Sequence, residues 1–191
     1  MTICTTVPNN YFAPWDFVKS MLQLPAKYSY YATQGVSVPD NRNRIVEYVK
    51  STDQDFLLVD SDMKFTPEDV AKIEEHLNNG LDVISGICVL GRPPYAPSVF
   101  KRIKGDYELT DVPKELSKVD AVGTAFVGIS NKILHKLQKD PFLMLWEGDI
   151  QHGNDISFCH RVNEVGEIWL DPTISVGHIR VDYHYYEQRT D

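Results

Sequence analysis

Short apolar runs alternate with amphipathic segments along the first half of the chain. An apolar run of about four to eight residues between polar neighbours is typical of a buried strand, and apolar positions three or four residues apart are typical of a helix. Strands that alternate with helices predict βαβ units and a mainly parallel sheet. We therefore predict strands over residues 2–7, 28–33, 56–59 and 82–89, and helices over 14–24, 40–50 and 67–77.

The second half of the chain is less regular and richer in aromatic residues. Its Gly- and Pro-rich segment 91–97 predicts a loop, and residues 99–109 predict a hairpin that turns at 104–106. We expect an apolar strand over 119–129 that two glycines interrupt, a helix over 131–139, a loop over 146–154, a helix from there to about 165 and a strand over 168–170. We predict a single domain over 1–191, in which residues 1–90 bind a nucleotide and residues 91–191 bind a second substrate.

Composition and charge narrow the function. A formal net charge of −8 argues against broad binding of nucleic acid, which needs clustered Lys and Arg, although a small phosphorylated ligand can still bind beside a metal ion and a few arginines. The cysteines form no Cys-x-x-Cys pair, and no apolar run approaches membrane-spanning length. We therefore expect a cytoplasmic protein without a transmembrane segment, located in the host cytoplasm if the chain is viral.

The apolar run 56–59 ends abruptly at Asp60-Ser61-Asp62. Ligands of open α/β sheets bind just beyond the carboxyl ends of such strands, and two carboxylates placed there indicate a divalent cation and its phosphates. The spacing alone proves little, because a chain this rich in aspartate contains Asp-x-Asp by chance, as at 53–55. That second instance has no strand leading into it and is typical of a solvated turn.

A second informative segment begins at Gly153-Asn154-Asp155, where a helix is expected. Asn154 or Asp155 is in a position to cap this helix, because short polar side chains accept hydrogen bonds from the first backbone N–H groups. A carboxylate at a helix start that points into a cleft can also serve as a general base. The residues alone leave both interpretations open.

Five motifs in a fixed order connect these segments: 60–62, 122–126 (Val-Gly-Thr-Ala-Phe), 153–159, 169–172 (Trp-Leu-Asp-Pro) and 177–178 (Gly-His). Their order and spacing resemble the GT-A class of nucleotide-sugar glycosyltransferases, particularly family 2 and its compact bacterial or viral relatives. The resemblance covers residues 2–178. It implies a GT-A (Rossmann-like) α/β fold with a mainly parallel mixed sheet flanked by helices. It also implies metal-dependent transfer of a sugar, with inversion, from a nucleotide sugar, expected to be UDP-linked, to a hydroxyl of a saccharide acceptor.

The resemblance implies a metal site. Asp62 would ligate Mn²⁺ or Mg²⁺ directly, with Asp60 beside it orienting the donor, and His178 would complete the site. Mixed carboxylate and imidazole ligation suits manganese better than calcium. Without the resemblance, His178 is more typical of a surface or structural histidine.

The resemblance also implies a base. The family pattern usually has Glu-Asp where this chain has Asn154-Asp155, and in inverting members this Asp takes the proton from the acceptor hydroxyl. Asp155 is therefore the candidate catalytic base, with Glu147 and Asp149 on the preceding segment as rivals. Trp146 beside them is suited either to stacking on an acceptor sugar or to anchoring the core.

The remaining donor contacts are also assigned by resemblance. The end of the first strand would hold the base and ribose, and a guanidinium from the 40–44 segment would contact the diphosphate or the base, since it makes paired bonds to phosphate oxygens. A solvated helix face explains that segment equally well. The residues assigned to the donor are Thr5, Thr6, Val7, Arg42, Asp60, Ser61, Gly123 and Thr124.

Three alternatives compete with this prediction. Haloacid-dehalogenase-type phosphohydrolases also place two aspartates after an apolar strand, but their motif continues with Gly and Thr or Val, whereas Met63-Lys64-Phe65 follows here. A sugar-nucleotide pyrophosphorylase needs a Gly-rich basic loop after the first strand, and residues 5–10 contain no Gly, Lys or Arg. A non-catalytic module that binds a saccharide or a nucleotide sugar is the third. The chain is also compatible with an excised domain of a longer polypeptide.

Overall fold

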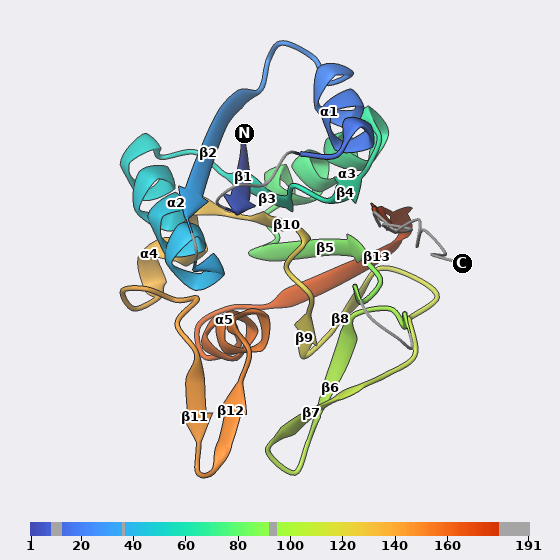
Figure 1. Cartoon of the computed structure of the whole chain (residues 1–191). Coiled ribbons are helices and arrows are strands. Elements are labelled where there is room, and N and C mark those ends of the chain that lie inside the picture. The colour runs from blue at the N-terminus through green and yellow to red at the C-terminus, as the bar shows by residue number, and fades with distance from the viewer. Residues whose placement is uncertain (9–12, 36, 92–94, 180–191) are drawn as a thin grey trace, which may run out of the picture.

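The computed structural model describes residues 1–8, 13–35, 37–91 and 95–179. Its centre is a seven-stranded sheet with the strand order β2-β1-β3-β10-β5-β13-β8 (Figure 1). Strands β1, β2 and β3 are mutually parallel, β5 is parallel to β13, β10 is antiparallel to both of its neighbours, and β8 is antiparallel to β13. The strands are β1 (Thr2–Pro8), β2 (Ser29–Gly35), β3 (Phe56–Asp60), β5 (Val83–Ile87), β8 (Ser117–Lys118), β10 (Phe126–Ile129) and β13 (Ile168–Ser175).

Helices cover both faces of this sheet (Figure 1). Apolar residues of α2, α4 and α5 form one core with the sheet, and those of α1 and α3 form a second core on the other face. Leu58 belongs to the first core and Leu57 and Val59 to the second, so β3 is buried on both faces as its unbroken apolar run predicted. The helices are α1 (Trp15–Leu22), α2 (Val38–Thr52), α3 (Pro67–Asn78), α4 (Asn131–Lys136) and α5 (Asn154–Asn163).

The predicted alternation of the first half is confirmed, with shifts of a few residues at the ends of elements. α3 begins where the sequence indicated, because Thr66 and Asp69 form a capping box: the Thr66 hydroxyl accepts from the Asp69 N–H, and the Asp69 carboxylate accepts from the Thr66 N–H. α2 begins at Val38 rather than residue 40, because Ser37 caps it and Pro39 lies in its first turn.

Three smaller sheets lie at the edges of the central one. β4 (Met63–Lys64) pairs with β14 (Gly177–His178), and β6 (Val99–Ile103) pairs with both β7 (Asp106–Leu109) and β9 (Ala121–Val122). β11 (Leu145–Glu147) pairs with β12 (Ile150–His152). The predicted hairpin over 99–109 is therefore confirmed, with its turn at Lys104 and Gly105, which both have positive φ. Figure 1 shows the β6–β7 and β11–β12 hairpins extending away from the central sheet on the side of α5.

Two predictions for the second half were wrong. Where a loop over 146–154 was expected, residues 145–152 form a hairpin, because Gly148, at φ 59°, permits a tight turn between Glu147 and Ile150. The expected strand over 119–129 is divided: β9 pairs with β6, and the chain then crosses through Gly123 to the central sheet as β10. A Cβ at Gly123 would lie 2.6 Å from the Ser98 hydroxyl oxygen, so the crossing point needs a glycine.

No helix within the described ranges is long and apolar enough to cross a membrane. The cysteines Cys4, Cys88 and Cys159 are buried free thiols. Burial raises the pKa of Cys4 and of Cys159 to about 12 and also raises that of Cys88, so all three thiols stay protonated near neutral pH.

Candidate functional site

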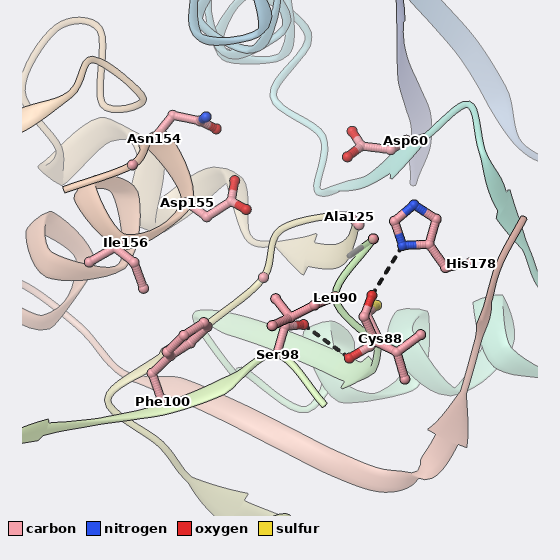
Figure 2. A pocket seen from close by; sticks show the side chains of 14 residues that line it. Asp60, Cys88, Leu90, Ser98, Phe100, Ala125, Asn154, Asp155, Ile156 and His178 are labelled. Carbon is pink, nitrogen blue, oxygen red and sulfur yellow. Dashed lines mark hydrogen bonds between the residues drawn. The ribbon is translucent and has the colours of Figure 1, made fainter. Parts of the chain in front are cut away.

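A cavity of about 270 Å³ lies where the parallel strands end. Three residues at or just after strand ends line the cavity: Asp60 is the last residue of β3, Cys88 follows β5, and His178 is the last residue of β14. Asp155, in the first turn of α5, lines it as well, and Figure 2 shows its carboxylate across the cavity from Asp60 and His178. Segments far apart in the sequence thus meet at the sheet edge where open α/β folds bind ligands.

A network of hydrogen bonds centred on Arg42 connects the two carboxylates of this cavity. Nη2 of Arg42 donates to both oxygens of Asp60, at 3.1 and 2.9 Å. Nη1 donates to Oδ1 of Asp155 and to Oδ1 of Asn154. Thr124 donates its hydroxyl to the same Oδ1 of Asp155, at 2.6 Å. One guanidinium therefore holds two carboxylates that come from different parts of the chain.

Arg42 itself is buried, with 3% of its side chain exposed. α2 contributes it from the face that packs on the sheet, next to the buried Asn41 and Asn43, whereas Arg44 is exposed. Burial lowers the pKa of Arg42, but the carboxylates of Asp60 and Asp155 outweigh that effect, so the pKa is raised and the guanidinium stays charged. The interpretation of this segment as a solvated helix face is therefore wrong for Arg42 and correct for Arg44.

Asp60 is the more enclosed of the two carboxylates. Burial raises the pKa of its carboxyl group, and Asp155 and Asp62 raise it further, while Arg42 lowers it. Thr6, at the end of β1, donates its hydroxyl to Oδ1 of Asp60 at 3.3 Å. Among the described residues the cavity therefore concentrates negative charge that Arg42 compensates only in part.

Neither Asn154 nor Asp155 caps α5. Gly153 occupies the cap position without a side-chain hydrogen bond, and the two polar residues follow inside the first turn. Their side-chain oxygens bind Arg42 instead, because α5 starts directly opposite the buried guanidinium. Within the part of the chain that the structure describes, Oδ2 of Asp155 has no hydrogen-bond partner, and 39% of the side chain is exposed. One oxygen of Asp155 is thus held in place while the other remains able to accept a proton.

Asp62 and His178 form a second pair beside the cavity: His178, in β14, lines the cavity, whereas Asp62, directly before β4, does not line it. Nε2 of His178 lies 3.0 Å from Oδ2 of Asp62, and Nδ1 lies 3.1 Å from the carbonyl oxygen of Val89. A carbonyl oxygen only accepts, so Nδ1 carries the proton, and in the neutral imidazole Nε2 presents a lone pair to the carboxylate. Two acceptors this close need a proton or a cation between them.

This pair fits a divalent cation. A carboxylate oxygen and an imidazole nitrogen are donors that suit Mn²⁺ better than Ca²⁺. Among the described residues no group of three or more His, Cys, Asp or Glu side chains gathers to hold a metal, so Asp62 and His178 would supply part of the coordination. Asp60 is directed to Arg42 rather than to this pair.

The other predicted donor residues divide into two groups. Gly123 lines the cavity, while Thr6 and Thr124 reach it indirectly, through their hydrogen bonds to the two carboxylates. Thr5 and Ser61 are buried, and like Val7 they do not line the cavity. The hydroxyl oxygen of Thr5 is one of the buried polar atoms that have no hydrogen-bond partner within the described ranges.

The rival bases lie outside the cavity. Oε1 of Glu147 accepts from Arg102 at 2.6 Å, and Oε2 lies 2.9 Å from Nε2 of His152, so both oxygens are occupied. Asp149 is an exposed residue of the hairpin turn. Trp146 is 60% exposed, which shows that it does not anchor the core and leaves a role at the surface.

Sequence reasoning missed much of the cavity wall. Ser98 and Phe100, from β6 and the segment before it, and Ile156, from α5, complete it (Figure 2). The carbonyl of Val89, which orients His178, was also missed. No signal in the sequence pointed to these residues, because they follow ordinary strand and helix patterns, and the Gly- and Pro-rich segment 91–97 indicated only a loop.

Comparison with known families finds no matching family, and no curated protein matches the sequence. Solved structures do match. A197 from STIV aligns with a TM-score of 0.67 at 16% identity, over 99% of this chain and 100% of that protein. GalNAc-T7, solved with UDP, GalNAc and Mn²⁺, aligns with a TM-score of 0.65 at 11% identity, over 94% of this chain and 43% of that one.

The chain has the GT-A fold. The predicted fold class is thereby confirmed. Identities of 16% and 11% establish the fold alone, so activity has to be argued from the cavity.

Proposed function

We propose that this protein is a glycosyltransferase that transfers a sugar from a nucleotide sugar, UDP-linked, to a hydroxyl of a saccharide acceptor with inversion at the anomeric carbon. The observation that carries the proposal is the position of Asp155. Its carboxylate lines the cavity opposite Asp60 and His178, with one oxygen immobilised and the other without a partner among the described residues. The GT-A fold and the presence of UDP and Mn²⁺ in the GalNAc-T7 structure support the choice of donor.

The residues present suggest the course of the reaction. The acceptor hydroxyl gives its proton to Oδ2 of Asp155 while its oxygen forms a bond to the anomeric carbon. The bond between that carbon and the diphosphate oxygen breaks, and its electron pair leaves with the nucleoside diphosphate. A single positioned carboxylate used as a general base typically contributes about 10²–10⁴-fold to such a step.

Charge in the cavity favours a bound cation. Among the described residues Asp60 and Asp155 line the cavity, and Asp62 lies beside it through its contact with His178. These three carboxylates oppose one described guanidinium, that of Arg42, which leaves two negative charges when His178 is neutral. Asp62 and His178 would hold Mn²⁺ or Mg²⁺, which would neutralise charge on the departing diphosphate. Asp60, already fixed by Arg42 and Thr6, would orient the donor.

Titration calorimetry with UDP and Mn²⁺ tests the donor site. We expect the wild-type protein to bind UDP only with Mn²⁺ present and Asp62→Asn to lose this binding. Asp53→Asn is a matched control, because Asp53 belongs to the Asp-x-Asp sequence outside the cavity and its φ of 55° is tolerated by Asn. Absence of binding to the wild-type protein, or equal binding to Asp62→Asn, would refute the donor site.

Turnover separates an enzyme from a binding module. Nucleotide sugars are first screened by metal-dependent thermal stabilisation, where a ligand at about 100 times its Kd adds roughly 2.7 kcal/mol. The stabilising donor is then incubated with saccharide acceptors, and NMR determines the anomeric configuration of the product. Binding without transfer or hydrolysis would favour a non-catalytic module, and retention of configuration would remove Asp155 from the role of base.

A further inference from the structure

We propose that Arg42 is a positioning residue: it sets the place of Asp155 relative to Asp60 and thereby aims Oδ2 of Asp155 at the acceptor hydroxyl. This inference rests on the proposed sugar transfer. It differs from a direct contact between Arg42 and the nucleotide, because both Nη atoms are already bonded to side chains of the protein. The remaining donor of Arg42, Nε, is buried and has no hydrogen-bond partner among the described residues, so a phosphate could reach the guanidinium only if a neighbouring side chain moved.

The shape of the guanidinium explains how one side chain can set two others. Its planar group carries donors in a fixed fork, so the two carboxylates bound by Nη1 and Nη2 acquire a fixed separation. Asp60 comes from the end of β3 and Asp155 from the start of α5, 95 residues later in the chain. Among the described residues the side chains of Asp60 and Asp155 share no other hydrogen-bond partner than Arg42.

The guanidinium of Arg42 also contacts the aromatic ring of Phe142. Its central carbon lies 5.6 Å from the ring centroid of Phe142, a favourable arrangement for a cation and an aromatic face. Phe142 stacks on Phe158 of α5, with ring centroids 4.4 Å apart and ring planes at 4°. The backbone N–H of Phe142 donates to the side chain of Asn43, the neighbour of Arg42 on α2, at 3.0 Å. Close packing on this side limits the movement of the guanidinium toward Phe142.

The hydrogen bonds at Asp155 select one oxygen as the base. Arg42 and Thr124 both donate to Oδ1, so the carboxylate cannot rotate without breaking these hydrogen bonds. Oδ2 is therefore the oxygen left for the substrate. A general base must lie within hydrogen-bond reach of the proton that it abstracts, and a displacement of about 1 Å can cost about 100-fold in rate. The effect of Arg42 on catalysis is therefore expected to pass through Asp155.

A double-mutant cycle of Arg42→Lys and Asp155→Asn tests this inference. Lys keeps the positive charge but lacks the fork, so we expect Arg42→Lys to lower kcat by about 100-fold in the wild-type background. In the Asp155→Asn background, where no base remains to be aimed, the same change should lower kcat less than about threefold. Arg44→Lys, an exposed change on the same helix, is the matched control and should leave kcat unchanged.

A merely structural role gives a different result. If Arg42→Lys lowers kcat by the same factor in both backgrounds, Arg42 does not act through Asp155 and the inference is overturned. If the wild-type protein shows no transfer with any donor, the proposed function fails instead, and the two failures are thus distinguishable.

NMR of the guanidinium group provides a second measurement that does not need Arg42→Lys to fold. Side-chain N–H signals of Arg42 should be resolved in the wild-type protein, because its Nη atoms are buried and hydrogen-bonded. Asp155→Asn should shift these signals, and Glu147→Gln, a change outside the cavity, should not. Signals that are the same in the wild-type protein and in Asp155→Asn would contradict the contact on which the inference depends.

Discussion

Two groups of paired charges in this protein have different surroundings. The cavity cluster consists of Arg42, Asp60 and Asp155, and its central cation is 3% exposed. The hairpin cluster consists of Arg102, Glu147, His152 and His160, with Arg102 at 41% exposure. The hairpin cluster connects the β6–β7 hairpin to the β11–β12 hairpin and α5, and none of its members lines the cavity.

The carboxylates of the two clusters differ in how many of their oxygens are hydrogen-bonded, and this difference separates Asp155 from Glu147 as candidate bases. In the hairpin cluster the two oxygens of Glu147 are each occupied, one by Arg102 and one by His152, so the carboxylate has no oxygen left for a substrate. In the cavity cluster Arg42 and Thr124 both donate to Oδ1 of Asp155, and neither donates to Oδ2. This difference in the occupancy of individual oxygens is our reason for proposing Asp155, rather than Glu147, as the base.

The largest contrast is expected in catalysis. Asp155→Asn should reduce kcat by about 10²–10⁴-fold, because it removes the proton acceptor while keeping the shape of the side chain. Glu147→Gln should change kcat by less than about threefold, since Glu147 stays outside the proposed reaction. Initial rates with the donor found by thermal screening measure both. Equal losses in the two variants would erase the distinction between the clusters.

Stability should depend on the support of the cavity cluster. Phe142→Ala should lower the free energy of unfolding by about 3–5 kcal/mol, because it leaves a cavity in the core beneath Arg42 and next to Phe158. Urea unfolding followed by circular dichroism gives this value. Phe100→Ala, at a half-buried position on β6, is the control and should cost clearly less. A Phe142 variant as stable as the wild-type protein would show that the packing behind Arg42 is dispensable.

A smaller effect is expected at the exposed face of the β11–β12 hairpin. Trp146 of β11 pairs with Gln151 of β12, and Gln151 lies four positions before Asp155 in the chain. The ring of Trp146 is exposed. An aromatic contact contributes about 0.5–1.5 kcal/mol, so Trp146→Ala should raise the KM for the acceptor by about two- to tenfold at unchanged donor KM. Trp15→Ala, an equally exposed Trp on α1, should change neither constant. A rise in donor KM alone would place the acceptor elsewhere.

The smallest effect concerns the ion pair between the hairpins. Arg102→Ala should lower the free energy of unfolding by about 0.2–1 kcal/mol, because this partly exposed pair is screened by water. Chemical denaturation in low and high salt measures it, and the loss should shrink at high salt. A loss above about 3 kcal/mol would show that the hairpin cluster, like the cavity cluster, behaves as a buried network.

Much of the fold followed from local patterns. The apolar run of β3 is buried on both faces, and Thr66 with Asp69 starts α3, as these residues indicated. The β11–β12 hairpin escaped prediction because one of its inward residues, Glu147, is charged and obscures the expected alternation. Glu147 pairs there with Arg102, from another hairpin, and with His152.

By itself, the sequence determined that strands alternate with helices in the first half and that Asp60 and Asp62 follow a buried strand, because periodicity and burial are properties of neighbouring residues. The resemblance nominated Asp155 and His178 as their partners. Only the tertiary structure decided which atoms meet. Oδ1 of Asp155 reaches Arg42 across 113 positions and Nε2 of His178 reaches Asp62 across 116, and such contacts depend on how the sheet brings the ends of its strands together. The burial of Arg42, on which its proposed role as a positioning residue rests, is likewise a property of packing.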